Sequence, residues 1–115
     1  MLVAGGNVIV PRARRTDGPF ERARGLLARP PLKTGEALLI EPCSGIHTWA
    51  MAHPIDAAFL DRRGRVLKVA EHLPPWRFSR CPGARAVVEL AAGEMTRLGL
   101  AKGMEVEWRE IAEAE

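Results

Sequence analysis

The apolar segments of this chain are short, and glycine or proline interrupts nearly all of them. Eleven glycines and nine prolines are spread over 115 residues. Proline breaks the interior of a helix, and glycine supplies the turn conformations that other residues avoid. A chain divided in this way is typical of many short strands joined by turns.

Six to seven short strands are predicted from the apolar and alternating runs. Asp61-Arg62-Arg63-Gly64 indicates a tight hairpin between two of them, because glycine tolerates the positive φ that such a turn needs. Inside the first run, Gly5-Gly6-Asn7 indicates a bulge or a turn. The predicted strands cover residues 3–10, 37–40, 46–51, 55–60, 66–70, 84–90 and 104–108.

One helix is expected near the N-terminus, where Asp17 can cap the first turn and Pro30-Pro31 ends the pattern. A short helical turn is expected over 93–98, with Gly99 as its terminator. Strands therefore outweigh helices. The sequence predicts one mainly β domain (a β-rich α+β fold) over residues 1–115, compact and barrel-like or sandwich-like.

The composition is that of an ordinary globular protein, with 47% hydrophobic and 27% charged residues. No run approaches the roughly 20 apolar residues of a membrane span, so no membrane contact is expected. The N-terminal segment has no basic flank and too few apolar residues for a signal peptide. Two cysteines do not make a disulfide framework. The expected location is the cytoplasm, with both thiols reduced.

The charges are unevenly distributed, although the net charge is only +3. One interpretation of the arginine-rich N-terminal quarter is a patch for nucleic acid. The other is a solvated helix face, which we favour because no aromatic residues alternate with these arginines. Nucleic acid is therefore not an expected partner. The arginines are Arg12, Arg14, Arg15, Arg22, Arg24 and Arg29.

Four sequence blocks occur in an order and spacing that match one protein family. They are residues 25–29, 54–66, 88–93 and 98–103. With these blocks, the chain resembles the bacterial and archaeal family called domain of unknown function 192, over about residues 22–108. The resemblance implies a compact β-rich domain with a short helix near its start, and it implies no established activity.

The chain departs from that family at one segment. Many members carry Trp-Met-Lys-Asn-Thr before the proline, whereas this chain has His47-Thr48-Trp49-Ala50-Met51. Chemistry that needs that lysine or asparagine cannot be carried over.

Asp56 is a single carboxylate in an apolar strand, beside Ala58 and Leu60 on one face. A carboxylate among apolar neighbours must be hydrogen-bonded or shifted in pKa. It could be a general base or a ligand anchor. We favour a structural carboxylate that accepts backbone N–H groups near Pro54.

Cys43 lies four positions before His47, a spacing that suggests a Cys–His nucleophile. Such a pair needs both groups on one side of the chain and a third residue to orient the ring. A metal site would draw on Cys43, His47, His53, His72 and Cys81, but zinc ligands usually occur in closer pairs than these. We therefore predict no metal, and the absence of a phosphate-loop motif or a dinucleotide motif predicts no cofactor.

The segment 74–82 is expected to be a loop, and it combines a large apolar residue, Trp76, with Arg77 and Arg80. Binding sites combine an apolar wall with a few polar groups. Glu89, a lone charge in another strand, could pair with either arginine. Trp76 could instead fold back over the core.

Three hypotheses follow. The first is a small non-catalytic binding or accessory domain with a cleft near His47, Asp56 and the 74–82 loop, which could hold a small anionic ligand. The second is a small hydrolase or metal-assisted enzyme using Cys43, His47 and Asp56. The third is a weak nucleic-acid module. We rank the binding domain first because no complete catalytic set is recognisable.

Overall fold

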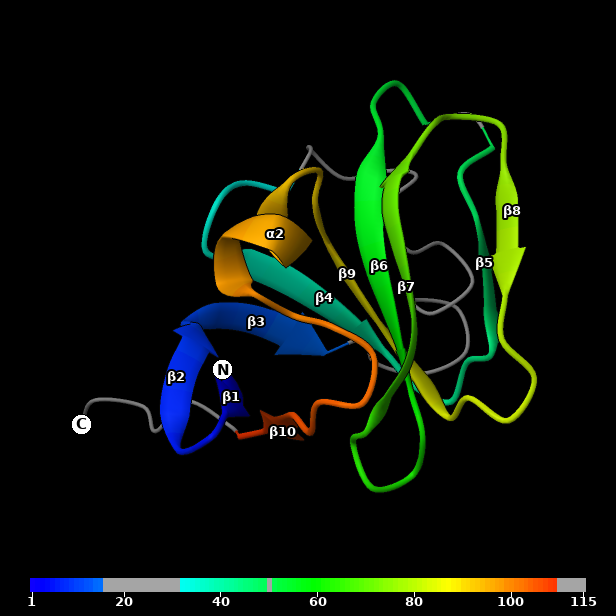
Figure 1. The fold of residues 1–115 in the computed structure, drawn as a ribbon. Coiled ribbons are helices and arrows are strands. Elements are labelled where there is room, and N and C mark those ends of the chain that lie inside the picture. Colours follow the sequence, from blue (N-terminus) through cyan, green and yellow to red (C-terminus); the bar gives the residue numbers. More distant parts are fainter. Residues whose placement is uncertain (16–31, 50, 110–115) are drawn as a thin grey trace.

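The computed structural model describes residues 1–15, 32–49 and 51–109 (Figure 1). The helix expected between Asp17 and Pro30 lies outside these residues. The described residues contain ten strands and one helix, α2 (Glu94–Leu98). The strands are β1 (Leu2–Ala4), β2 (Asn7–Val10), β3 (Arg12–Arg15), β4 (Glu36–Ile40), β5 (Gly45–His47), β6 (Ile55–Leu60), β7 (Val66–Leu73), β8 (Phe78–Arg80), β9 (Ala86–Ala91) and β10 (Glu107–Trp108).

The strands form three sheets. The central sheet has five strands in the order β3-β4-β9-β6-β7, in which β3 and β4 run parallel and the other neighbours antiparallel. A three-stranded sheet, β10-β1-β2, and a two-stranded ribbon, β5-β8, complete the fold. Because β3 and β7 end the central sheet without pairing to each other, the described strands do not close into a barrel. The barrel alternative is wrong, and the mainly β class with one described helix is correct.

Both faces of the central sheet are buried. In β6, Ile55, Ala57 and Phe59 point to one face and Ala58 and Leu60 to the other, as the alternation predicts. We call the side covered by α2 and the three-stranded sheet the helix face, and the side covered by the β5-β8 ribbon the ribbon face. The helix-face cluster is Leu2, Val10, Ala13, Ala37, Leu39, Ala58, Leu60, Val66, Ala86, Val88, Leu90, Met95, Leu100 and Val106. The ribbon-face cluster is Leu38, Ile40, Ile46, Met51, Ile55, Ala57, Phe59 and Val87.

The described strands outnumber the six or seven expected. Residues 3–10 form two strands rather than one, because Gly5 and Gly6 both take positive φ and reverse the chain between β1 and β2. The strand at Arg12–Arg15 was not expected, since only Ala13 of its four residues is buried. Residues 78–80, expected within a loop, are β8, which pairs with β5.

The hairpin turn at residues 61–64 is confirmed, and it depends on Gly64. Gly64 has φ of +85°, and a Cβ at this position would lie 2.1 Å from the carbonyl oxygen of Val106. The Val106 N–H in turn donates to the Gly64 carbonyl at 2.9 Å. Any side chain here would push the C-terminal segment away from the hairpin.

The short helix before Gly99 is also confirmed. Gly99 has φ of 70°, and its N–H donates to the Thr96 carbonyl, which ends α2. No helix in the described part of the chain is long and apolar enough to cross a membrane.

Candidate functional site

The β5-β8 ribbon has an inner and an outer side. Its strands pair antiparallel, with His47 opposite Phe78 and Gly45 opposite Arg80. Ile46 and Ser79 alternate with these residues and are buried, so the ribbon packs on the central sheet through them. The Phe78 ring lies across Gly45, because its Cζ atom is 3.5 Å from the position of a Cβ on Gly45.

Aromatic rings are exposed along the outer side of this ribbon and at its end. Trp49 is 52% exposed, Trp76 65% and Phe78 58%, and together with Val8 they are the exposed large hydrophobic residues of the described chain. The His47 and Trp49 rings are in contact, with centroids 4.9 Å apart and planes tilted by 31°. We call His47, Trp49, Trp76 and Phe78 the aromatic face. Exposed apolar surface that gathers at one place commonly marks a binding site.

Thr48 fixes the backbone that carries Trp76. Its side chain is fully buried, and its hydroxyl donates to the Pro74 carbonyl at 2.6 Å and accepts the Arg77 N–H at 2.9 Å. The Thr48 carbonyl also accepts the Trp76 N–H at 3.0 Å. Trp76 itself has φ of 64°, a strained conformation for a large residue. These bonds hold the indole outside the core, so Trp76 does not fold back as a lid.

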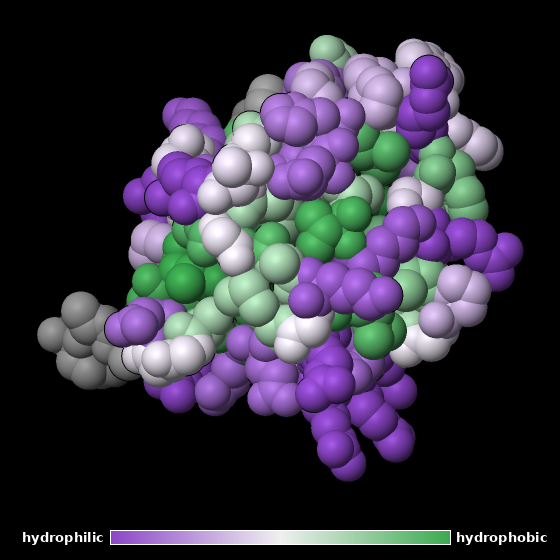
Figure 2. All heavy atoms as spheres, in the orientation of Figure 1, coloured by the Kyte–Doolittle hydropathy of each residue, from purple (hydrophilic) through white to green (hydrophobic). Residues whose placement is uncertain are grey.

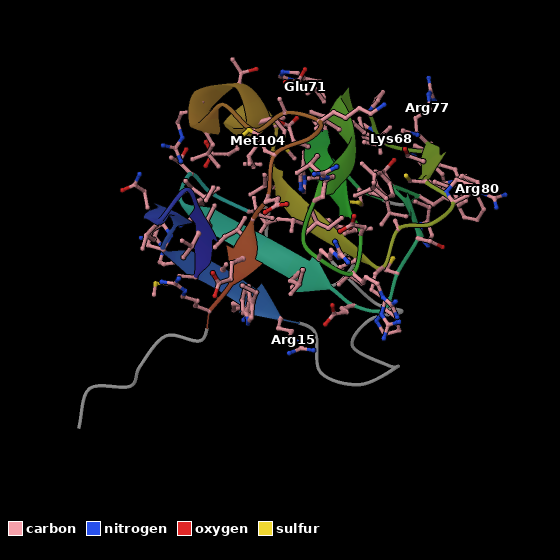
Figure 3. All side chains as sticks on the ribbon, turned by 60° about the horizontal axis from the view of Figure 1, so that its bottom comes forward. Arg15, Lys68, Glu71, Arg77, Arg80 and Met104 are labelled. Atoms are coloured by element: carbon pink, nitrogen blue, oxygen red, sulfur yellow. The ribbon has the colours of Figure 1, made fainter. Side chains whose placement is uncertain are left out.

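Positive charge lies beside the aromatic face. Arg77 and Arg80 are exposed, and Figure 3 shows both projecting outward from the β8 side of the molecule. Lys68 on β7 donates from Nζ to the Arg80 carbonyl at 3.0 Å, which ties the ribbon to the central sheet. Of the predicted site residues, the structure thus places His47 and Arg80 on the ribbon, and Trp76 and Arg77 in the segment directly before β8.

Asp56 lies elsewhere, on the helix face. It is fully buried, and its Oδ1 accepts the His72 N–H at 2.8 Å. Its Oδ2 accepts the N–H groups of Gly93 at 3.0 Å and Met95 at 2.9 Å. Gly93, the N-cap residue of α2, has no side chain to cap the helix, so Asp56 supplies that acceptor from β6. The donors come from residues 72–95 rather than from the turn at Pro54.

Glu89 lies two positions after Val87 in β9, so both side chains point to the ribbon face. Burial raises the pKa of its carboxyl to about 7, because charge is costly in an apolar environment. Its Oε2 has no hydrogen-bond partner among the described residues. No ion pair in the same residues joins Glu89 to Arg77 or Arg80, which are both exposed.

The catalytic set Cys43, His47 and Asp56 is not assembled. The Cys43 thiol donates to the Gly45 carbonyl at 3.0 Å and packs against the ribbon-face cluster, whereas His47 points outward and Asp56 lies across the sheet. Cys81 packs against the same cluster, and no disulfide joins it to Cys43. Residues 1–15, 32–49 and 51–109 contain no group of three or more His, Cys, Asp or Glu side chains placed to hold a metal.

Two arginines of the N-terminal group are already engaged. Arg12 donates to the Thr34 carbonyl at 3.1 Å, and Arg15 pairs with Glu41 at 2.7 Å. Arg22, Arg24 and Arg29 lie outside the described residues.

Sequence reasoning missed Trp49 and Phe78. Alternation in an extended chain could have identified them. Phe78 precedes the small Ser79, and Trp49 follows Thr48, so both rings fall on the side opposite to these buried residues. Reading 74–82 as a loop without regular structure hid that alternation.

Comparison with known proteins places the chain in a family. The model of DUF192, described as Uncharacterized ACR, matches residues 3–108, and the chain belongs to this family. A protein of unknown function from Novosphingobium aromaticivorans DSM 12444 is 28% identical with a TM-score of 0.71, over 84% of this chain and 72% of that one.

A second solved structure, from Sinorhizobium meliloti 1021, carries the provisional name of a transcription regulator. It is 22% identical with a TM-score of 0.74, over 83% of this chain and 79% of that one. This likeness shows a shared fold. No curated protein matches the chain.

Proposed function

We propose that this DUF192 chain is a small non-catalytic binding domain, and that the aromatic face with Arg77 and Arg80 is its binding surface. The ligand class that fits is a molecule with a flat ring and a negative charge. The ring would stack on exposed indole or phenyl groups, and the charge would pair with a guanidinium fork. This proposal keeps the predicted loop residues and moves the site away from Asp56.

One observation carries the proposal: Trp76 is held exposed in a strained backbone conformation. Its φ of 64° and its 65% exposure are both unfavourable for an isolated domain. The buried hydroxyl of Thr48 maintains them through two hydrogen bonds to the same turn. Such strain persists where the surroundings over-determine it, and it concentrates at ligand-binding sites.

The enzyme alternative has less support. The Asp56 carboxylate is occupied by three backbone N–H groups, so it has little capacity left to act as a base or to orient His47. His47 instead packs its ring against Trp49 in a tilted contact, an arrangement suited to widening an aromatic surface.

The test is a thermal-shift screen of ring-bearing anions, nucleoside monophosphates and aromatic carboxylates, on the full chain. We expect at least one class to raise the Tm of wild type in proportion to its occupancy. Trp76→Ala and Phe78→Ala should abolish that shift, and Arg77→Gln should weaken it.

Val8→Ala is the matched control, because Val8 is similarly exposed (50%) but lies on β2. It should respond to ligand like wild type. If a stabilising ligand acts equally on wild type, Trp76→Ala and Phe78→Ala, the site lies elsewhere. If no ring-bearing anion shifts wild type, the proposed ligand class is wrong.

A further inference from the structure

A second surface, separate from the aromatic face, gathers arginines from distant parts of the chain. A hollow of about 560 Å³ lies between the β6-β7 hairpin turn, the segment before β9 and Glu105. Its charged lining residues are Asp61, Arg62, Arg63, Arg65, Arg85 and Glu105. Figure 2 shows strongly hydrophilic side chains projecting at this lower end of the molecule, where Figure 1 places the hairpin.

A neighbouring hollow continues this surface. Its volume is about 340 Å³, and it is lined by Arg15, Glu41, Pro42, Arg62 and Arg85. Arg62 and Arg85 line both hollows, so they stand at the centre of one continuous basic surface. We call the two hollows together the arginine hollow.

The acidic residues of the arginine hollow do not neutralise it. Glu41 pairs with Arg15 at 2.7 Å, and Glu105 approaches Arg65 at 3.9 Å. Among the described residues, no ion pair engages Arg62, Arg63 or Arg85. Of the acidic residues that line the arginine hollow, only Asp61 then remains to balance the three unpaired arginines.

Asp61 is itself committed to the turn. Its Oδ1 accepts the backbone N–H groups of Arg63 at 2.8 Å and Arg65 at 2.9 Å. These bonds, the Arg65 one foremost, lower the pKa of Asp61 below its usual range. The carboxylate therefore organises the loop that presents the arginines, and a surplus of positive charge remains.

We propose that the arginine hollow is a binding site for linked phosphate groups, centred on Arg62 and Arg85. Guanidinium groups bind phosphate oxygens in bidentate fashion, and a pair of linked phosphates offers enough oxygens for several arginines at once. Two phosphates also carry enough charge to outweigh the repulsion from Asp61. The site shares no residue with the aromatic face, so the two proposals stand or fall separately.

The test is an NMR titration of the ¹⁵N-labelled full chain at low salt with two probes, inorganic pyrophosphate and single-stranded oligothymidine. In wild type, pyrophosphate should shift the amide signals around residues 61–65 and 83–85. The Arg62→Gln/Arg85→Gln double variant should bind it at least about tenfold more weakly, because two charge-assisted contacts are lost. Added salt should weaken binding in wild type.

Arg14→Gln is the control, since Arg14 is an exposed residue of β3 that lines neither hollow, and its loss removes one positive charge against two in the double variant. It should change pyrophosphate affinity less than about twofold. Pyrophosphate binding that is equal in the control and the double variant, or absent from wild type, would overturn the site. Oligothymidine could bind wild type more tightly than pyrophosphate and lose as much affinity in the double variant. That result would assign the site to a nucleic-acid backbone. If oligothymidine does not bind, the site is assigned to small phosphates.

Discussion

Among the described residues, the strands of the central sheet carry two buried carboxylates, Asp56 on the helix face and Glu89 on the ribbon face, and their hydrogen bonding differs. On the helix face, Asp56 accepts three backbone N–H groups and joins β6 to α2 and to the end of β7. On the ribbon face, Glu89 is nearly as buried, but its Oε2 has no partner among the described residues. Satisfied buried polar groups rigidify a core, whereas unsatisfied ones reduce its stability.

The elements that cover the two faces also differ, and the helix face again has the more complete structure. The helix face is closed by a helix and a three-stranded sheet, while the ribbon face is covered by two short strands whose outer side exposes the aromatic face. The helix face therefore has the character of a structural core. The ribbon face carries strain, an unpaired acid and exposed rings, features that proteins retain at binding sites.

The largest expected effect comes from removing the helix-face carboxylate. Asp56→Ala would leave three backbone N–H groups without their acceptor and should lower the free energy of unfolding by about 4 kcal/mol. Urea unfolding followed by circular dichroism measures it. Asp56→Asn keeps an acceptor oxygen and should lose less. A loss no greater than that of Asp61→Ala, a partly exposed turn carboxylate, would contradict the structural role of Asp56.

Glu89 should make the ribbon face sensitive to pH. Its folded pKa of about 7 exceeds the ordinary value of 4.5, so the folded state holds a proton that the unfolded state releases between these values. The contribution of Glu89 to the free energy of unfolding is therefore fully present below about pH 4.5 and is lost by about pH 7. The free energy of unfolding should fall by about 3 kcal/mol over this range.

Glu89→Gln should remove that fall and make the protein more stable than wild type at pH 8. Urea unfolding of both proteins from pH 4.5 to 8 gives the difference directly, and Glu105→Gln, an exposed change, serves as control. If the difference in free energy of unfolding between wild type and Glu89→Gln does not vary with pH, the raised pKa of Glu89 is wrong.

A smaller effect should follow from loosening the turn under Trp76. Thr48→Val keeps the shape but removes the hydroxyl that bonds Pro74 and Arg77, and it should cost about 2 kcal/mol. It should also shift the tryptophan emission spectrum as the turn relaxes. Thr96→Val, whose hydroxyl bonds exposed Glu71 at 3.0 Å, should change stability by less than about 0.5 kcal/mol. If Thr48→Val and Thr96→Val lose the same free energy of unfolding, the Thr48 hydroxyl does not stabilise the turn under Trp76.

The smallest effect is expected on the aromatic face itself. Phe78→Ala should change the free energy of unfolding by less than about 0.5 kcal/mol, because the ring is mainly exposed. Phe59→Ala, which empties a fully buried position on the ribbon face, should cost about 3–5 kcal/mol. Thermal and urea unfolding of both variants would check this. A loss at Phe78 close to that at Phe59 would make the outer ring part of the core.

Local patterns predicted the middle of this fold well. The strand at 55–60 has the predicted bounds and the predicted alternation, and the turn ending at Gly64 joins it to β7. These features depend on periodicity two and on the positive φ of one glycine, which neighbouring residues reveal. The strand β8 was missed because three residues with one buried member resemble a loop until β5 is placed beside them.

The sites depend on contacts between distant residues, which no local pattern contains. Asp56 was expected to be structural, but its donors come from residues 16 to 39 positions further along the chain. The arginine hollow combines Arg15, Arg62 and Arg85, which are brought together only by the pairing of the central sheet. The aromatic face was half predicted, through His47 and Trp76.

The capping of α2 by Asp56 has a consequence for the order in which the protein folds. The helix has five residues, far fewer than the roughly 12 that an isolated helix needs, and its acceptor lies 37 and 39 residues earlier. It therefore cannot persist until β6 and β9 have paired, so it should form after the rate-limiting step. Chevron kinetics of Met95→Ala should show faster unfolding with refolding nearly unchanged. If α2 forms after β6 and β9 pair, the sheet assembles with the α2 side of β6 still open to water.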